Sequence, residues 1–128
     1  MASKLQLKEF IILSAELTTS NHNDARTARL ENMLVDLKLS YKRVEGVYKG
    51  TSEVSFMVIV KDEAEIQTIT DLGLITFAQE SVLFRDLHGN AKLVYKDGEE
   101  NIGTFKQVDD VINLDAYTIV NNNYWVAV

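Results

Sequence analysis

The chain has 128 residues, of which 46% are hydrophobic and 25% charged, and its formal net charge is −6. These values are typical of a single compact domain spanning residues 1–128. The sequence has no cysteine, which excludes disulfides, catalytic thiolates and cysteine-bound zinc. Its two histidines are too few for a three-histidine site, so we expect no bound metal.

The charge balance indicates which partners to expect. Thirteen basic against 19 acidic residues disfavour nucleic acid, because its phosphates are also negative. Cationic small molecules would be favoured, although solubility alone also explains a charge of this size. No stretch approaches the roughly 18 consecutive apolar residues of a membrane span, and residues 1–8 lack the apolar run of a signal peptide. We therefore expect a cytoplasmic protein without nucleic-acid or membrane partners.

The first half of the sequence predicts a buried strand, a helix and a hairpin. The apolar run at 9–16 is typical of a buried strand. Apolar residues then recur at three-to-four spacing over 23–39, with asparagine or aspartate available as the N-cap, which predicts a helix. Segments 41–49 and 51–60 alternate with period two on either side of Gly50, so they should pair as a hairpin.

The second half predicts another helix followed by short strands. Residues 62–76 favour a helix whose end is obscured by Gly73. The remaining expected elements are a hairpin of 81–84 and 91–95, a turn at Asp97-Gly98, a strand over 102–108, a helical turn over 109–114, and a closing hairpin over 116–128 around Asn121-Asn122-Asn123.

The order strand, helix, strand, strand, helix, strand matches the ferredoxin-like βαββαβ pattern. The predicted fold class is therefore α+β, an antiparallel sheet with two helices packed on one face, followed by additional β-hairpins. The other face of the sheet must be covered by the later strands or by a second subunit.

Few residues stand out as chemical groups. The sequence has no phosphate-binding loop, no H-E-x-x-H and no nucleophile elbow. Glu53 shares a strand face with Ser55 and Met57, opposite the obvious core residues, and is either a solvated strand-end carboxylate or a ligand-binding group. Tyr41 and Tyr48 lie at odd separation on the preceding strand, so only one of them can lie beside Glu53.

A second polar group lies at the junction between the second helix and the next strand. Gln79, Glu80 and Ser81 follow one another there, where polar side chains can meet a ligand. Termination of the helix explains these residues equally well.

A series of short segments is similar to a known family. They run in order from about Phe10 to Val126, and together they resemble the phage-encoded enzymes that cleave S-adenosylmethionine, long called hydrolases and now regarded as lyases. The segments are Ile12-Leu13-Ser14-Ala15, Glu45-Gly46-Val47-Tyr48, Glu53, Gln79-Glu80-Ser81-Val82-Leu83, Ala91-Lys92-Leu93-Val94-Tyr95, Gly103-Thr104-Phe105-Lys106-Gln107-Val108, Tyr117-Thr118-Ile119 and Trp125-Val126.

The resemblance implies cleavage of S-adenosylmethionine to 5′-methylthioadenosine and homoserine lactone, which depletes the cofactor of host restriction-modification enzymes. It also implies a homotrimer with active sites between subunits, working in the host bacterial cytoplasm without a cofactor or metal. On this basis Glu53 would bind the α-ammonium, and Tyr48, or else Tyr41, would orient the sulfonium. The candidates for the substrate's polar edges are Ser14, Gln79, Glu80 and Ser81.

Three other functions are alternatives to the lyase reaction. True hydrolysis would use Glu53 as a general base and give homoserine directly. A non-catalytic module would bind a small ligand or a protein without turnover. An acidic mimic of DNA is a poor fit, because basic residues interleave with the acidic ones.

Overall fold

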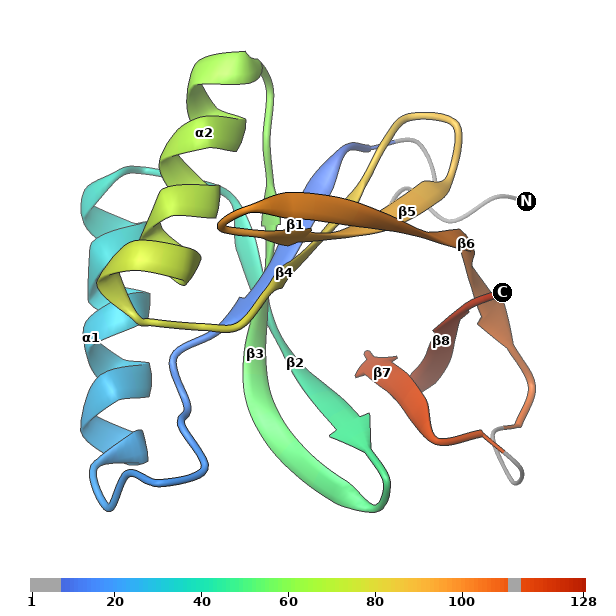
Figure 1. The fold of residues 1–128 in the computed structure, drawn as a ribbon, viewed down its shortest axis with the longest axis horizontal. Helices are drawn as coiled ribbons and strands as arrows, with labels where there is room; N and C mark the ends of the chain where they lie inside the picture. The colour runs from blue at the N-terminus through green and yellow to red at the C-terminus, as the bar shows by residue number, and fades with distance from the viewer. Residues whose placement is uncertain (1–7, 111–113) are drawn as a thin grey trace.

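The computed structural model describes residues 8–110 and 114–128, and its centre is a closed barrel of antiparallel strands (Figure 1). Neighbouring strands follow the order β1-β3-β2-β7-β8-β6-β5-β4, and β4 pairs with β1 to close the barrel. The strands are β1 (Phe10–Ser14), β2 (Tyr41–Tyr48), β3 (Thr51–Ile59), β4 (Val82–Arg85), β5 (Asn90–Tyr95), β6 (Gly98–Val108), β7 (Ala116–Val120) and β8 (Asn123–Ala127).

The helices lie together on one side of the barrel (Figure 1). They are α1 (Asn23–Asp36), α2 (Glu63–Asp71) and the π-helical turn η2 (Leu72–Thr76). The Asp62 side chain caps α2 by accepting a hydrogen bond from the Glu65 amide at 2.8 Å. Helix α1 begins after His22, which makes no side-chain capping bond, so the expected asparagine or aspartate cap is wrong.

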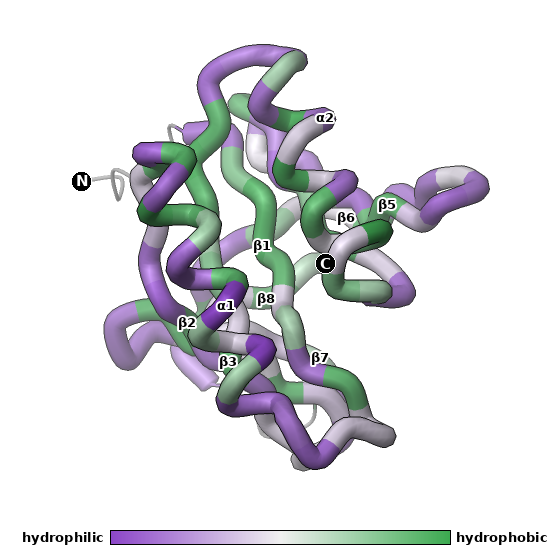
Figure 2. The backbone as a smooth tube through the Cα atoms, turned by 90° about the vertical axis from the view of Figure 1, so that its left-hand side faces the viewer, coloured by the Kyte–Doolittle hydropathy of each residue, from purple (hydrophilic) through white to green (hydrophobic). Residues whose placement is uncertain are grey.

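Alternation along the strands creates two separate apolar cores. On β1, Ile11 and Leu13 face outward and pack with apolar side chains of the helices. Phe10 and Ile12 face inward and pack with Trp125 and other residues inside the barrel. Because both faces are buried, hydrophobic residues run along β1 without interruption, as Figure 2 shows.

Two tight turns set the register of the hairpins nearest the site. Lys49 and Gly50 join β2 to β3 with φ angles of 49° and 81°. Asn121 and Asn122 join β7 to β8 with φ angles of 51° and 66°. Two consecutive residues with positive φ favour the hairpin turns that match the natural twist of the strands, and glycine and asparagine tolerate them best.

Closure of the barrel depends on β6, which changes partner along its length. Its first part pairs with β5, and Phe105–Val108 pair with β8. The change follows Gly103, which has φ of 101° and lies next to a break in register at Ala91/Lys92. A bulge and a left-handed glycine bend a strand sharply, which allows one strand to serve two neighbours.

The predicted fold class is therefore wrong, because the sheet is not an open ferredoxin-like sheet with helices on one face but a closed eight-stranded barrel. The predicted strands and helices are present. However, β7 pairs with β2 and β8 pairs with β6, so the closing hairpin lies within the sheet and completes the barrel. The strand expected over 102–108 is longer, starting at Gly98. The helical turn expected over 109–114 includes residues 111–113, which lie outside the described residues.

Candidate active site

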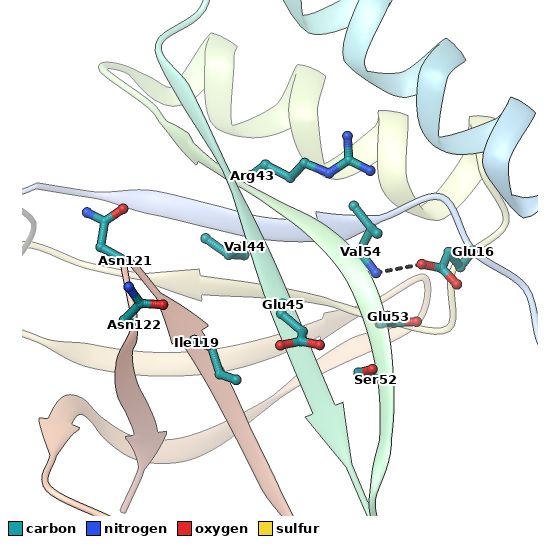
Figure 3. Close-up of a pocket in the computed structure, with 10 residues that line it drawn as sticks. All are labelled: Glu16, Arg43, Val44, Glu45, Ser52, Glu53, Val54, Ile119, Asn121 and Asn122. Atoms are coloured by element: carbon teal, nitrogen blue, oxygen red, sulfur yellow. Dashed lines mark hydrogen bonds between the residues drawn. The ribbon is translucent and has the colours of Figure 1, made fainter.

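An open pocket of about 510 Å³ lies where β2, β3 and the segment after β1 approach the β7–β8 turn (Figure 3). Polar and charged side chains dominate its walls. The lining residues are Glu16, Arg43, Val44, Glu45, Ser52, Glu53, Val54, Ile119, Asn121 and Asn122.

The charge of this pocket is acidic. Three glutamates, Glu16, Glu45 and Glu53, line it together with one arginine. Arg43 extends away from Glu45 and Glu53 in Figure 3, and its guanidinium lies 3.9 Å from the Glu31 carboxylate on α1. The pocket is therefore suited to a cationic ligand.

Glu53 occupies a special position between the pocket and the barrel interior. It lies opposite Gly46 in the β2–β3 ladder, on the same face as the inward-facing Met57. Glu53 is an exposed residue, but desolvation by neighbouring atoms still raises the pKa of its carboxyl, and the negative charge of Glu16 raises it further. A positive group bound here would relieve both effects.

Glu16 is held in place by a network of hydrogen bonds. One carboxylate oxygen accepts a bond from the Val54 amide at 2.5 Å, and the Gln79 side-chain amide donates to the Glu16 carbonyl at 2.9 Å. Arg26 braces the same segment, since its guanidinium donates to the carbonyls of Ala15 and Phe77 at 2.6 Å each. Two segments that are distant in the sequence thus fix the carboxylate that lies beside Glu53.

Ser14 belongs to the inner face of the barrel, opposite Ser55 of β3, and Ser81 is a half-buried residue just before β4. The hydroxyl of Ser14 donates to the Val54 carbonyl at 2.8 Å and accepts from the Glu16 amide at 3.0 Å. The ladder between β1 and β4 ends at the pair Ile12 and Leu83, and Ser81 precedes the first residue of β4. Glu80 is exposed and does not line the pocket.

The two candidate tyrosines lie in different surroundings. Tyr48 pairs with Thr51 at the end of the hairpin, on the face of Glu53 and diagonal to it, and 61% of its surface is exposed. Tyr41 lies on the other face, opposite Val58, and its hydroxyl donates to Glu31 at 2.9 Å. The structure brings Tyr48 toward Glu53 and places Tyr41 against α1.

Sequence reasoning missed several residues that line the pocket, including Glu16, Glu45 and the two turn asparagines. Glu16 lies two residues after the end of the buried strand β1, which is a signal that could have been used, because strand ends often carry ligand-binding groups. The asparagines were recognised only as a turn. Their proximity to β2 depends on pairing of β2 with β7, which no local pattern reveals.

Comparison with known proteins identifies the family. The sequence profile of the S-adenosylmethionine lyase family matches residues 11–128. The chain belongs to the S-adenosylmethionine lyase family. This member is an enzyme that acts on S-adenosylmethionine, as the resemblance in its short segments indicated. No curated protein matches it. Within residues 8–110 and 114–128, none of the helices of this lyase-family member has the length and apolar composition to cross a membrane.

Proposed function

We propose that the enzyme cleaves S-adenosylmethionine to 5′-methylthioadenosine and L-homoserine lactone. The observation that carries this proposal is the position of Glu53 beside Glu16 in an acidic pocket of a chain from the S-adenosylmethionine lyase family. The substrate bears a sulfonium and an α-ammonium against one carboxylate, so its net charge is positive. Two neighbouring carboxylates that repel one another favour such a ligand.

The proposed reaction requires neither a metal ion nor a catalytic thiol. An oxygen of the substrate's α-carboxylate attacks the γ-carbon and forms a C–O bond, which closes a five-membered lactone. The bond between the γ-carbon and sulfur breaks, and its electron pair stays on sulfur as a neutral thioether. The α-ammonium keeps its protons, and the step requires no proton transfer.

The enzyme's contribution is to hold the substrate in a reactive conformation. Well-oriented intramolecular reactions gain about 7–11 kcal/mol over their bimolecular counterparts. Opposite charges neutralise as the lactone forms, so exclusion of water from the carboxylate and sulfonium also speeds the step. Glu53 itself is exposed, so the water-excluding walls of the site would come from the bound substrate and its neighbours.

In this mechanism Glu53 binds the α-ammonium and fixes the methionyl chain. The ring of Tyr48, on the same face, orients the sulfonium by cation–π contact. Gln79 positions Glu16, because the Gln79 side-chain amide donates a hydrogen bond to the Glu16 carbonyl. Ser14 positions β3 through its hydrogen bond to the Val54 carbonyl, and Ser81, just before β4, is proposed to bind a polar edge of the substrate.

Direct hydrolysis is the second candidate, and one observation favours it. A carboxyl whose pKa is raised is a better general base near neutral pH, so Glu53 would also suit activation of a water molecule. The product would then be homoserine, formed without a lactone intermediate.

The proposed reaction is tested by incubating the purified chain with S-adenosylmethionine and analysing promptly quenched samples by mass spectrometry. Methylthioadenosine appearing together with homoserine lactone is the expected result. An unchanged substrate would refute catalysis and leave the non-catalytic binding module as the explanation. Homoserine as the first product, without lactone at early times, would favour hydrolysis.

The biological setting is part of the proposal. We propose a homotrimer with active sites between subunits, acting in the host bacterial cytoplasm to deplete the cofactor of restriction-modification enzymes, without a bound cofactor. The exposed Tyr48 at the hairpin end is available to a neighbouring subunit. Light scattering tests the trimer, and a fall in cellular S-adenosylmethionine on expression tests the depletion. A monomer, or an unchanged cellular level, would contradict the respective part.

A further inference from the structure

A single glycine interrupts the inner face of the barrel beside Glu53. Gly46 lies directly opposite Glu53 on β3 and directly opposite Thr118 on β7. Directly paired residues of an antiparallel ladder share a face, so the missing side chain leaves a small cradle between Glu53 and Thr118. A side-chain carbon at Gly46 would lie 3.4 Å from the Ser55 hydroxyl and 3.7 Å from the Glu53 Cγ.

Two residues with hydroxyl side chains lie beside this cradle, and most of their surface is buried. Ser55 is 3% exposed and Thr118 is 8% exposed. Buried hydroxyls in proteins almost always have hydrogen-bond partners. Ser14 makes two side-chain hydrogen bonds, whereas Ser55 and Thr118 make none to the other residues in 8–110 and 114–128, and their hydroxyl oxygens are not sealed from solvent. The Ser55 hydroxyl points to the cradle over Gly46.

The groups around the cradle match one kind of ligand. The Glu53 carboxylate and the hydroxyls of Ser55 and Thr118 all offer hydrogen-bond acceptors, and their residues lie on the same sheet face around Gly46. A primary ammonium has three donors and no acceptor, and its charge complements the carboxylate. A neutral or acidic group would leave the Glu53 carboxylate without a counter-charge.

We propose that the cradle over Gly46 is the receptor for the substrate's α-ammonium, with Glu53, Ser55 and Thr118 as its three acceptors. This inference rests on the proposed function and adds two hydroxyl groups and a glycine to the site. Gly46 is a specificity-determining residue, because its missing side chain makes room for the ammonium. Methylthioadenosine has no ammonium and makes no contact there, so the cradle distinguishes the substrate from this product.

The geometry provides a clean perturbation. Gly46→Ala places its methyl group at ordinary contact distance from Ser55 and Glu53, and the φ angle of Gly46 is not in the left-handed region. The variant should therefore fold, with a melting temperature no lower than that of the wild type, since alanine costs less entropy than glycine in a strand. The methyl group would nevertheless occupy the space of the ammonium.

The test measures binding of two unreactive probes by titration calorimetry. S-adenosylhomocysteine carries the α-ammonium, and methylthioadenosine lacks it. We expect Gly46→Ala and Thr118→Val each to weaken binding of S-adenosylhomocysteine by about tenfold or more, while affinity for methylthioadenosine changes by less than about twofold. The matched control is Thr27→Val, at a buried threonine of α1 outside the barrel, which should leave both affinities unchanged.

The possible results separate the inference from the proposed function. If the wild type cleaves S-adenosylmethionine but both variants bind S-adenosylhomocysteine normally, the cradle is not the ammonium receptor. Equal weakening of both probes would also overturn the inference, because it indicates a general distortion of the site. If the wild type neither binds the probes nor cleaves the substrate, the proposed function fails and the inference fails with it.

Discussion

Replacing Glu53 by glutamine removes the charge at the centre of the site while keeping its shape. A hydrogen bond to a charged group contributes about 1.5–3 kcal/mol. If that interaction holds the ammonium in the transition state, kcat/KM should fall by about 10- to 150-fold, at about 1.4 kcal/mol per factor of ten. The assay is the rate of methylthioadenosine release at substrate concentrations below KM.

The same substitution should not destabilise the protein. The pKa of Glu53 is raised above its ordinary value of 4.5, first by burial and then by Glu16. The folded state therefore binds this proton more tightly than the unfolded state, and stability is lost as pH rises from 4.5 through the raised pKa. At neutral pH Glu53→Gln should melt at a higher temperature than the wild type, and the difference should vanish below the ordinary pKa.

Glu63→Gln is the matched control, because Glu63 is an exposed residue of α2 and its substitution changes the net charge equally. It should leave kcat/KM unchanged. Turnover near the wild-type level in Glu53→Gln would refute the assignment of Glu53. A lowered melting temperature in Glu53→Gln at neutral pH would contradict the electrostatic reasoning even if activity fell.

Three further substitutions test separate parts of the account. Gly103→Ala should lower the free energy of unfolding by about 1–3 kcal/mol in urea titrations, because its φ is left-handed and its new methyl group would collide with the Val128 carbonyl; wild-type stability would contradict the account of β6. Tyr48→Leu should reduce kcat/KM by roughly 2- to 30-fold through loss of a cation–π contact, and Tyr41→Phe should have a smaller effect; the reverse order would exchange their roles. Asp86→Ala should lower the melting temperature at neutral pH. Burial raises the pKa of this carboxyl, but the hydrogen bonds from Asn90 and His88 and the charge of His88 together lower it below its ordinary value of 3.8. The stability contributed by Asp86 is present above pH 3.8 and is lost as pH falls through the lowered pKa. The difference in melting temperature between Asp86→Ala and the wild type should therefore shrink at acid pH, and a difference as large as at neutral pH would contradict this reasoning.

Local patterns were sufficient to predict most elements of the fold. The hairpin about Gly50 could be predicted because period-two alternation and a turn residue are both local signals. Closure of the barrel could not, because it depends on β6 leaving β5 for β8 at Gly103. A sequence shows that a glycine is present, but it does not show which strand the chain will meet beyond it.

The residues of the candidate site also include some that the sequence predicted and some that it did not. Glu53 stood out because it is a carboxylate near the start of a predicted strand, on the face opposite the obvious core residues. Glu16 and Thr118 did not, because their importance arises from partners far along the chain. Glu16 reaches Val54 from 38 residues away, and Thr118 meets Gly46 only through pairing of β7 with β2. Long-range register of this kind follows from the whole fold and not from any short segment.

The central claim is that the substrate's own carboxylate displaces the sulfur. The most direct measurement is to run the reaction in water labelled with heavy oxygen and to read the first-formed products by mass spectrometry. Intramolecular attack predicts methylthioadenosine together with homoserine lactone that carries no label. Labelled homoserine formed directly, without prior appearance of the lactone, would contradict the account and assign the reaction to water.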